Sequence, residues 1–231
     1  MIQANIDTLR LRIASACDRA GRSSADVALV AVSKTFPSAA IRQAVEAGVE
    51  EIGENYVQEL LGKRKDLAGL PIRWHFIGHL QSNNVKSVAP WGELIHAVDN
   101  AGLAREIDRH AARAGRVIDI LVEVNTTGEK SKFGLAPETT VPFIRSLEGM
   151  ANLRVAGLMT IGPFLPDPEG SRPMFRTLRE LRDETARLGQ PNAPMHHLSM
   201  GMTGDFEVAI EEGATLIRIG TAIFGSRVKR P

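Results

Sequence analysis

The chain has 231 residues, 43% of them hydrophobic and 24% charged, and its formal net charge is +1. This balance excludes the strongly basic field expected of a protein that binds nucleic acid or a membrane surface. Cys17 is the one cysteine, which excludes an internal disulfide and a cysteine-based metal cluster. The first 16 residues carry no apolar signal core, and no stretch is long and apolar enough to span a bilayer, so we expect a soluble cytoplasmic protein.

Strand-like and helix-like segments alternate along the whole chain. Short apolar runs predict strands at residues 29–33, 51–53, 72–77, 94–98, 118–124, 153–160, 196–200 and 216–219. Longer amphipathic segments, several of which end at a glycine, predict helices at 6–20, 39–47, 57–67, 85–89, 103–114, 138–147, 174–188 and 206–212.

This alternation predicts an α/β fold with a parallel sheet. Eight such units in about 200 to 250 residues indicate a single (β/α)8 barrel, and we expect residues 1–231 to form one domain. No long helix is expected after the eighth strand, so the additional N-terminal helix at 6–20 is predicted to take that place. A doubly wound open sheet is the alternative fold.

Lys34 stands at the end of the first predicted strand, and Thr35-Phe36-Pro37 breaks the chain directly after it. Parallel α/β sheets bind ligands at the carboxyl ends of their strands. A lysine partly removed from water has a lowered pKa, and a neutral amine can form a Schiff base. Lys34 is therefore a candidate functional amine, the alternative being a strand-end lysine that reaches into solvent.

Two later segments offer backbone amides and hydroxyls at strand ends. Ser199 begins a run rich in serine, glycine and threonine after the seventh strand, and Gly220-Thr221 follows the eighth. Barrel enzymes often bind phosphate with the loops after these two strands. The sequence therefore predicts a phosphate cradle, although Thr203 or Asp205 can also be read as an ordinary helix cap.

Two further residues are predicted to face the same ligand. Arg218 interrupts an apolar strand, and alternation puts it on the same face as Leu216 and Gly220. A buried arginine needs a partner because its charge cannot be titrated away; that partner is either a ligand or a carboxylate of the barrel. Asn55, after the second strand, could supply a hydrogen bond at the barrel mouth, or belong to plain turn chemistry.

Other polar residues carry weaker signals. His75 and His79 lie four apart near the third strand without a nearby cysteine or paired acid, so we expect no metal site. His196-His197 is expected at the far end of the barrel or in packing. Lys132 lies in a segment read most simply as a solvated loop, from which it could approach an anion.

One lysine, a phosphate cradle and a buried arginine together indicate pyridoxal 5′-phosphate (PLP). The aldehyde requires the amine, the phosphate requires the cradle, and the pyridine nitrogen requires a polar partner.

The chain resembles the pyridoxal phosphate homeostasis proteins, a group described as similar to the N-terminal domain of alanine racemase. The resemblance covers nearly the whole chain. It is carried by Ala-Val-Ser-Lys-Thr at 31–35, Gly-Glu-Asn-Tyr-Val-Gln-Glu at 53–59, Trp-His-Phe-Ile-Gly-His-Leu-Gln-Ser-Asn at 74–83, Ser-Lys-Phe-Gly at 131–134, Gly-Leu-Met-Thr-Ile at 157–161 and the run 198–225.

The resemblance implies a (β/α)8 barrel that binds PLP and has no established turnover. It also implies roles for the site residues. Lys34 is the Schiff-base lysine, Arg218 faces the pyridine nitrogen, Asn55 lines the pocket, and Ser199, Gly220 and Thr221 hold the phosphate. Asn84 departs from the family pattern, which usually has lysine there. We expect a monomer whose partners are PLP and, as recipients, apo PLP enzymes.

An amino-acid racemase on the same barrel is the alternative function. Racemisation requires two bases on opposite faces of the substrate carbon. Similar alanine racemases take the second base, a tyrosine, from an extra β domain that we do not expect here, and Tyr56 is the one tyrosine of this sequence. A lysine-dependent aldolase, which needs no phosphate cradle for a coenzyme, is a third reading.

Overall fold

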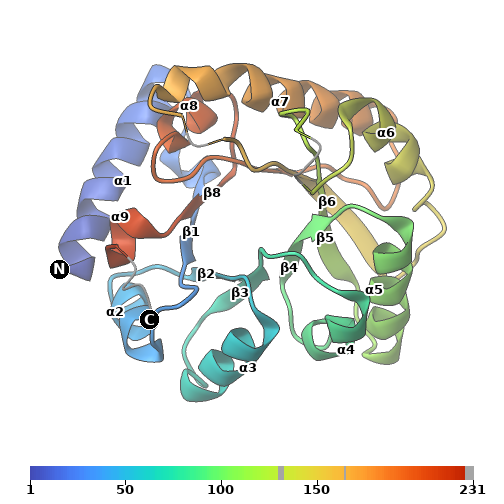
Figure 1. Ribbon diagram of the computed structural model, residues 1–231, viewed down its shortest axis with the longest axis horizontal. Coiled ribbons are helices and arrows are strands. Elements are labelled where there is room, and N and C mark those ends of the chain that lie inside the picture. The colour runs from blue at the N-terminus through green and yellow to red at the C-terminus, as the bar shows by residue number, and fades with distance from the viewer. Residues whose placement is uncertain (130–132, 164, 227–231) are drawn as a thin grey trace.

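Eight parallel strands close into a barrel in the computed structural model, which describes residues 1–129, 133–163 and 165–226 (Figure 1). Each strand pairs with the next in sequence, and β8 pairs with β1 to complete the ring. The strands are β1 (Ala28–Val32), β2 (Glu51–Glu54), β3 (Arg73–Phe76), β4 (Leu94–Val98), β5 (Ile118–Glu123), β6 (Leu153–Met159), β7 (His197–Ser199) and β8 (Leu216–Ile219). The predicted (β/α)8 barrel is confirmed.

Helices surround the barrel on the outside (Figure 1). They are α1 (Ile2–Arg19), α2 (Ser38–Glu46), α3 (Val57–Asp66), α4 (Val85–Val88), α5 (Ala101–Arg113), α6 (Pro137–Arg145), α7 (Arg172–Arg187), α8 (Phe206–Glu211) and α9 (Thr221–Phe224). Short 3-10 turns precede β1 at Ser24–Asp26, α4 at Ser82–Asn84 and α7 at Pro168–Ser171. The N-terminal helix α1 packs against α8, α2 and α9, and so takes the place that the sequence predicted for it.

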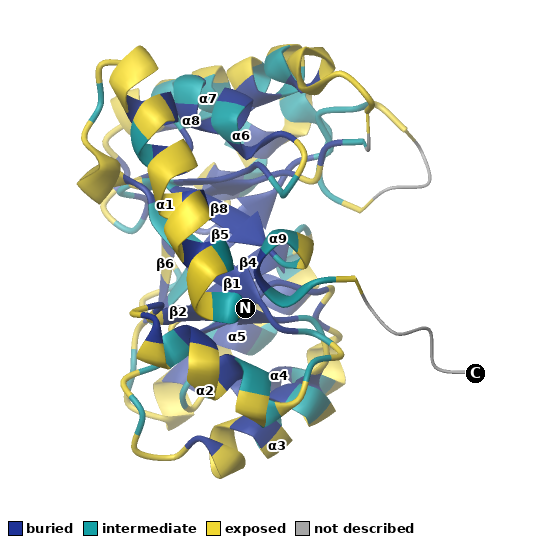
Figure 2. Ribbon diagram, turned by 90° about the vertical axis from the view of Figure 1, so that its left-hand side faces the viewer, coloured by how far each residue is buried: buried dark blue, intermediate teal, exposed yellow. Residues whose placement is uncertain are grey.

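Burial on both faces explains why the strands are apolar. Their outward side chains pack with the helices in one continuous core, and most of β4 and β5 is buried (Figure 2). The barrel interior holds a second, smaller apolar cluster: Val30, Leu94, Ala97, Leu121, Ala156, Met159 and Leu216. This interior is packed, so the room for a ligand lies at the ends of the strands.

The helix α1 begins at Ile2, four residues before its predicted start, and two further details differ from the sequence prediction. The seventh strand is shorter than 196–200, because the chain turns at Gly201, where φ is +89° and an added Cβ would lie 2.5 Å from the Cβ of Ala209. The four-residue helix α9 was missed because one turn is too short to show a helical period. Both differences lie in the segments predicted to bind phosphate.

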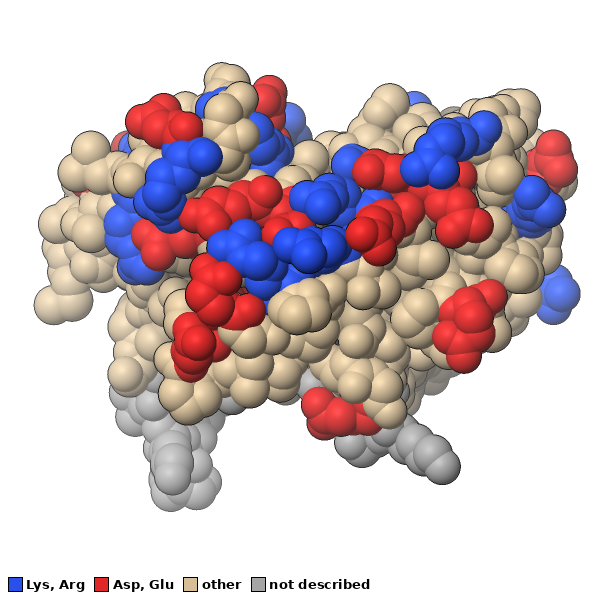
Figure 3. All heavy atoms as spheres, turned by 90° about the horizontal axis from the view of Figure 1, so that it is seen from above, with Lys and Arg blue, Asp and Glu red and all other residues tan. Residues whose placement is uncertain are grey.

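The surface carries mixed charge. The face that includes α7 shows basic and acidic side chains interleaved (Figure 3). Arg172 at the start of α7 pairs with Glu211 at 2.6 Å and with Glu212 at 3.2 Å. Among the helices of the described ranges, none has both the length and the apolar character needed to cross a bilayer.

Candidate functional site

A cavity of about 350 Å³ opens where the carboxyl ends of β1, β2, β3 and β8 meet. Five of the six predicted binding residues line it: Lys34, Asn55, Arg218, Gly220 and Thr221. The remaining lining residues are Val32, Ile77, Ile161, Met202, Thr203 and Gly204. The sixth predicted residue, Ser199, is fully buried behind Arg218 and is not part of the lining.

Lys34 occupies the second position of a tight turn after β1. The N–H of Phe36 donates to the carbonyl of Ser33 at 3.0 Å, which closes the turn Ser33–Phe36. Lys34 is half-buried and has interactions with its surroundings. Thr35, in the third position, has a φ of +70°, a conformation that β-branched residues rarely adopt. The amine thus stands on a strained but hydrogen-bonded turn at the rim of the cavity.

Asn55 is held in place by the close approach of Gly78. A Cβ at residue 78 would lie 2.8 Å from the Cα of Asn55 and would clash with its carbonyl oxygen, so glycine is required there. The side-chain Oδ1 of Asn55 is buried and has no hydrogen-bond partner among the described residues. Buried polar atoms are normally paired, so this unpaired oxygen of a cavity-lining residue is a candidate acceptor for a ligand donor.

The loops after β7 and β8 bring backbone amides to the cavity. Gly220 precedes α9 and Thr221 begins it. The N–H groups of Ile223 and Phe224 donate to the carbonyl of Gly220, which leaves those of Thr221 and Ala222 without a carbonyl partner within the helix. A Cβ at Gly220 would lie 3.3 Å from the carbonyl oxygen of Val32, so the chain passes close to β1 here. Met202, Thr203 and Gly204 complete the lining opposite. This arrangement suits an anion, which amides and hydroxyls bind well.

The guanidinium of Arg218 is fixed by two neutral acceptors. It donates from Nη1 to Ser199 Oγ at 2.6 Å and from Nη2 to the carbonyl of Thr160 at 2.8 Å. Burial lowers the pKa of Arg218 to about 10, against the opposite effect of the Glu123 and Asp205 carboxylates, so it remains charged at neutral pH. Within the described part of the chain its hydrogen-bond partners are these two, and neither is the barrel carboxylate raised as the alternative from the sequence.

A chain of buried polar groups continues from Arg218 across the barrel interior. Ser199 Oγ lies 3.0 Å from Nδ1 of His96, whose Nε2 lies 2.8 Å from Nδ1 of His75. The Nε2 of His75 lies 2.6 Å from Glu51, which also pairs with Arg73. In the arrangement with both imidazoles neutral, Arg218 donates to Ser199, the hydroxyl of Ser199 donates to His96, and each histidine carries its proton on Nε2.

Sequence reasoning missed this chain. His75 and His96 each interrupt an apolar strand, which signals a buried polar partner, but nothing local shows that the two meet. Burial and the neighbouring His75, Arg218 and His197 lower the pKa of His96 well below its usual range, so it is neutral. The chain therefore connects Arg218 at the cavity to Glu51 through Ser199, His96 and His75.

Glu123 is a second functional candidate that the sequence did not single out. It ends β5 and only 5% of its surface is exposed. Burial, and next the Asp99 carboxylate, raise the pKa of Glu123 to about 7, although Arg218 acts in the opposite direction. It therefore changes charge near neutral pH at the same end of the barrel as Arg218.

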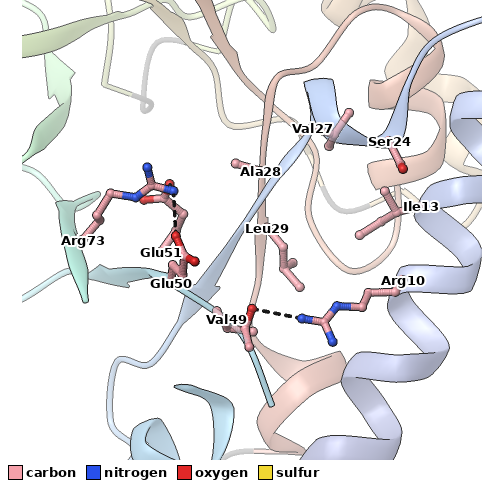
Figure 4. A pocket seen from close by; sticks show the side chains of 11 residues that line it. Arg10, Ile13, Ser24, Val27, Ala28, Leu29, Val49, Glu50, Glu51 and Arg73 are labelled. Carbon is pink, nitrogen blue, oxygen red and sulfur yellow. Dashed lines mark hydrogen bonds and ion pairs between the residues drawn. The ribbon is translucent and has the colours of Figure 1, made fainter. Parts of the chain in front are cut away.

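The remaining candidates lie elsewhere. His196 and His197 line a cavity of about 690 Å³ at the amino ends of the strands, as expected. A neighbouring cavity of about 410 Å³ on that face is lined by charged side chains that already have partners: Arg73 with Glu50 and Glu51, and Arg10 with the carbonyl of Gly48 (Figure 4).

The other sequence observations gain no support as parts of the site. His79 stacks on Phe133, and the described residues hold no group of histidines, cysteines and carboxylates that could bind a metal ion. Asn84 lines a separate hollow beside Tyr56. Lys132 lies outside the described residues.

Comparison with known proteins agrees with this geometry. Residues 4–228 match the family model described as alanine racemase, N-terminal domain. A pyridoxal phosphate homeostasis protein of Aquifex aeolicus is 49% identical over 216 residues, which cover 94% of both chains. The human protein of the same name is 42% identical over 86% of this chain and 76% of its own.

Solved structures share the fold. PipY of Synechococcus elongatus, determined with PLP bound, is 33% identical and superposes with a TM-score of 0.85 over 97% of this chain and the whole of that chain. An alanine racemase of Clostridium difficile, 13% identical, has a TM-score of 0.74 and is covered over 56% of its length, which shows the barrel alone. The chain belongs to the family of the alanine racemase N-terminal domain and, within it, to the pyridoxal phosphate homeostasis proteins.

Proposed function

We propose that this protein binds PLP in the cavity at the carboxyl ends of the strands and serves PLP homeostasis. The observation that carries the proposal is that Lys34, Arg218 and the Gly220-Thr221 step line one cavity. An amine, a cation and an anion cradle are the three groups that the aldehyde, pyridine nitrogen and phosphate of PLP require. The names of the relatives and the PLP-bound PipY structure support the same ligand.

Each residue has a separate part in this proposal. When bound, PLP supplies an aldehyde that forms a Schiff base with a lysine amine, and Lys34 is the lysine that lines the cavity. Arg218 donates a hydrogen bond to the pyridine nitrogen and keeps its own proton. The backbone of Gly220 and the hydroxyl of Thr221 bind the phosphate, together with Thr203 and Gly204 of the preceding loop. Asn55 bonds to the ligand through its unpaired amide oxygen.

Ser199 was predicted to hold the phosphate, and that assignment stays a prediction. Its hydroxyl accepts from Arg218 and bonds to His96, so we favour a role in orienting the guanidinium. In this proposal the phosphate is bound by the loops after β7 and β8, which line the cavity.

We propose that the protein is a carrier and not an enzyme. Racemisation needs a second base opposite Lys34, and Tyr56 is 57% exposed and is not part of the cavity lining. Arg218 at the ring leaves the pyridine nitrogen unprotonated, which makes it a poor electron sink.

We further propose that residues 1–231 form one domain, that the protein is a cytoplasmic monomer, and that apo PLP enzymes receive the cofactor from it.

The test is covalent labelling. The purified protein is mixed with PLP, reduced with borohydride, digested and analysed by mass spectrometry. We expect a phosphopyridoxyl group on the peptide that contains Lys34, and its loss in Lys34→Ala. The variant Lys65→Ala, which changes an exposed lysine of α3, is the matched control and should label as the wild type does. Label on another lysine, or no label, contradicts the assignment.

A further inference from the structure

Lys63 of α3 is a buried lysine outside the cavity. Only 7% of its surface is exposed, and its ammonium makes three hydrogen bonds. The acceptors are the carbonyl of Ser33 at 2.9 Å, Oε1 of Glu54 at 2.6 Å and Oε2 of Glu59 at 2.9 Å. An ammonium has three N–H donors, so its donor capacity is fully used.

These acceptors connect Lys63 to both sides of Lys34. Ser33, before it, is held twice: its carbonyl by Lys63 and its hydroxyl by Glu54 at 2.5 Å. Thr35, after it, donates its N–H to Oε2 of Glu59 at 2.8 Å, and this is the same oxygen that Lys63 bonds. A single ammonium therefore organises the hydrogen bonds on either side of the predicted reactive lysine.

The turn needs such support. Thr35 has a φ of +70° in the third position of the turn, where glycine is the usual residue. A β-branched residue in this conformation is strained and persists only where its surroundings enforce it. The charge-assisted bond from Thr35 N–H to Glu59 supplies that enforcement, and Lys63 fixes the position of the Glu59 carboxylate.

Stability alone does not account for these groups. Burial raises the pKa of Glu54 in spite of its bonds to Lys63 and Ser33, which reflects the cost of removing a carboxylate from water. A buried ion pair is often no more stable than apolar residues of the same volume, so its burial is weak evidence for a role in stability alone. All three partners of Lys63 lie in or bond to the residues that flank Lys34.

We propose that Lys63, acting through Glu54 and Glu59, is a positioning residue that fixes the Ser33–Phe36 turn so that the Lys34 amine meets the PLP aldehyde. The inference rests on the proposed function. In the step concerned, the neutral amine of Lys34 would add to the aldehyde carbon, a C–N double bond would replace the C–O double bond, and the aldehyde oxygen would leave as water with the two amine protons. Lys63 does not touch the ligand, and its effect is confined to the placement of the amine.

The test separates covalent capture from recognition. Pyridoxine 5′-phosphate carries the same ring and phosphate with an alcohol in place of the aldehyde, so its affinity reports the cavity without Lys34 chemistry. For Lys63→Met we expect its dissociation constant, measured by calorimetry, to stay within about threefold of wild type. The rate of PLP capture by Lys34, followed by absorbance and by borohydride labelling, should fall by about tenfold or more, as for a misplaced reacting group. Lys65→Met, on the exposed face of α3, should change neither value.

Two milder variants keep the test decisive if Lys63→Met does not fold. Lys63→Arg retains the charge and should recover part of the capture rate. Glu59→Gln keeps an acceptor for Thr35 but removes its charge, and should slow capture with unchanged pyridoxine 5′-phosphate affinity. Equal losses for both ligands, or wild-type capture in all three variants, would overturn the positioning role. Absence of Lys34 label in the wild type would instead contradict the proposed function, so the two failures are distinguishable.

Discussion

Ser199 accepts a 2.6 Å hydrogen bond from Arg218, with its oxygen buried behind the guanidinium. The same hydroxyl lies 3.0 Å from the ring of His96. Thr221, in the loop after β8, lines the cavity directly. The two hydroxyls that the sequence grouped together as phosphate ligands therefore stand in different surroundings.

This difference predicts separate effects of the two alanine substitutions. Thr221→Ala should weaken PLP about 10- to 100-fold, since a hydrogen bond to a charged group contributes about 1.5–3 kcal/mol, and should leave pyridoxal, which lacks the phosphate, almost unchanged. Ser199→Ala should weaken both ligands alike, because it acts through Arg218 at the ring. Affinities are measured by calorimetry, with Thr8→Ala on the exposed face of α1 as control. A selective loss of PLP in Ser199→Ala would restore Ser199 as a phosphate ligand.

Gly78→Ala should destabilise the fold and disturb Asn55. The added Cβ meets the Asn55 backbone, and overpacking of this kind costs roughly 1–3 kcal/mol. Gly62→Ala is the matched control, because Gly62 lies in α3 with open space around it and alanine favours a helix by up to about 1 kcal/mol. Urea unfolding should therefore give changes of opposite sign. Equal changes in the free energy of unfolding for the two variants would mean that the contact between residue 78 and Asn55 does not affect stability.

Most of the fold could be predicted from the sequence, because apolar runs mark the strands and amphipathic segments, several of which end at a glycine, mark the helices. The sequence also predicted that Lys34, Gly220 and Arg218 lie together, since the strand ends of a parallel barrel share one face; the three line one cavity, and their roles in binding PLP stay predictions. Partners set by the barrel's closure could not be predicted. Ser199 meets His96 across 103 positions, and the bond exists only once eight strands have a definite register.

Glu123 should make stability fall as pH rises toward neutral. The folded protein holds the Glu123 proton up to a pKa of about 7, whereas the unfolded chain releases it near 4.5, so ionisation favours unfolding between these values. Glu123→Gln removes this effect. Relative to wild type, its free energy of unfolding should increase by up to about 3 kcal/mol between pH 4.5 and 7.5.

The measurement is urea unfolding of the protein without ligand at several pH values. Glu180→Gln, exposed on α7, is the control and should show no such trend. A difference between Glu123→Gln and wild type that stays constant with pH would show that the carboxyl of Glu123 is already ionised at low pH.

Turnover separates the carrier from the racemase. Among the described residues that line the cavity, Lys34 and Arg218 are the two with ionisable side chains, and Arg218 stays charged at neutral pH, which leaves Lys34 as the candidate base. A racemase needs a second base on the opposite face of the substrate carbon.

An external amino acid can still displace Lys34 from PLP, because that exchange requires only an amine and the bound carbonyl carbon and breaks no C–H bond. We therefore expect added L-alanine to change the visible spectrum while its α-proton stays in place. The experiment incubates the PLP-loaded protein with L-alanine in deuterated water and follows deuterium uptake and chirality, with free PLP and Lys34→Ala as controls. Racemisation should be at least about 10³-fold slower than the ~10 s⁻¹ of a typical enzyme. Sustained racemisation over many turnovers that disappears in Lys34→Ala would contradict the carrier function and establish an enzyme.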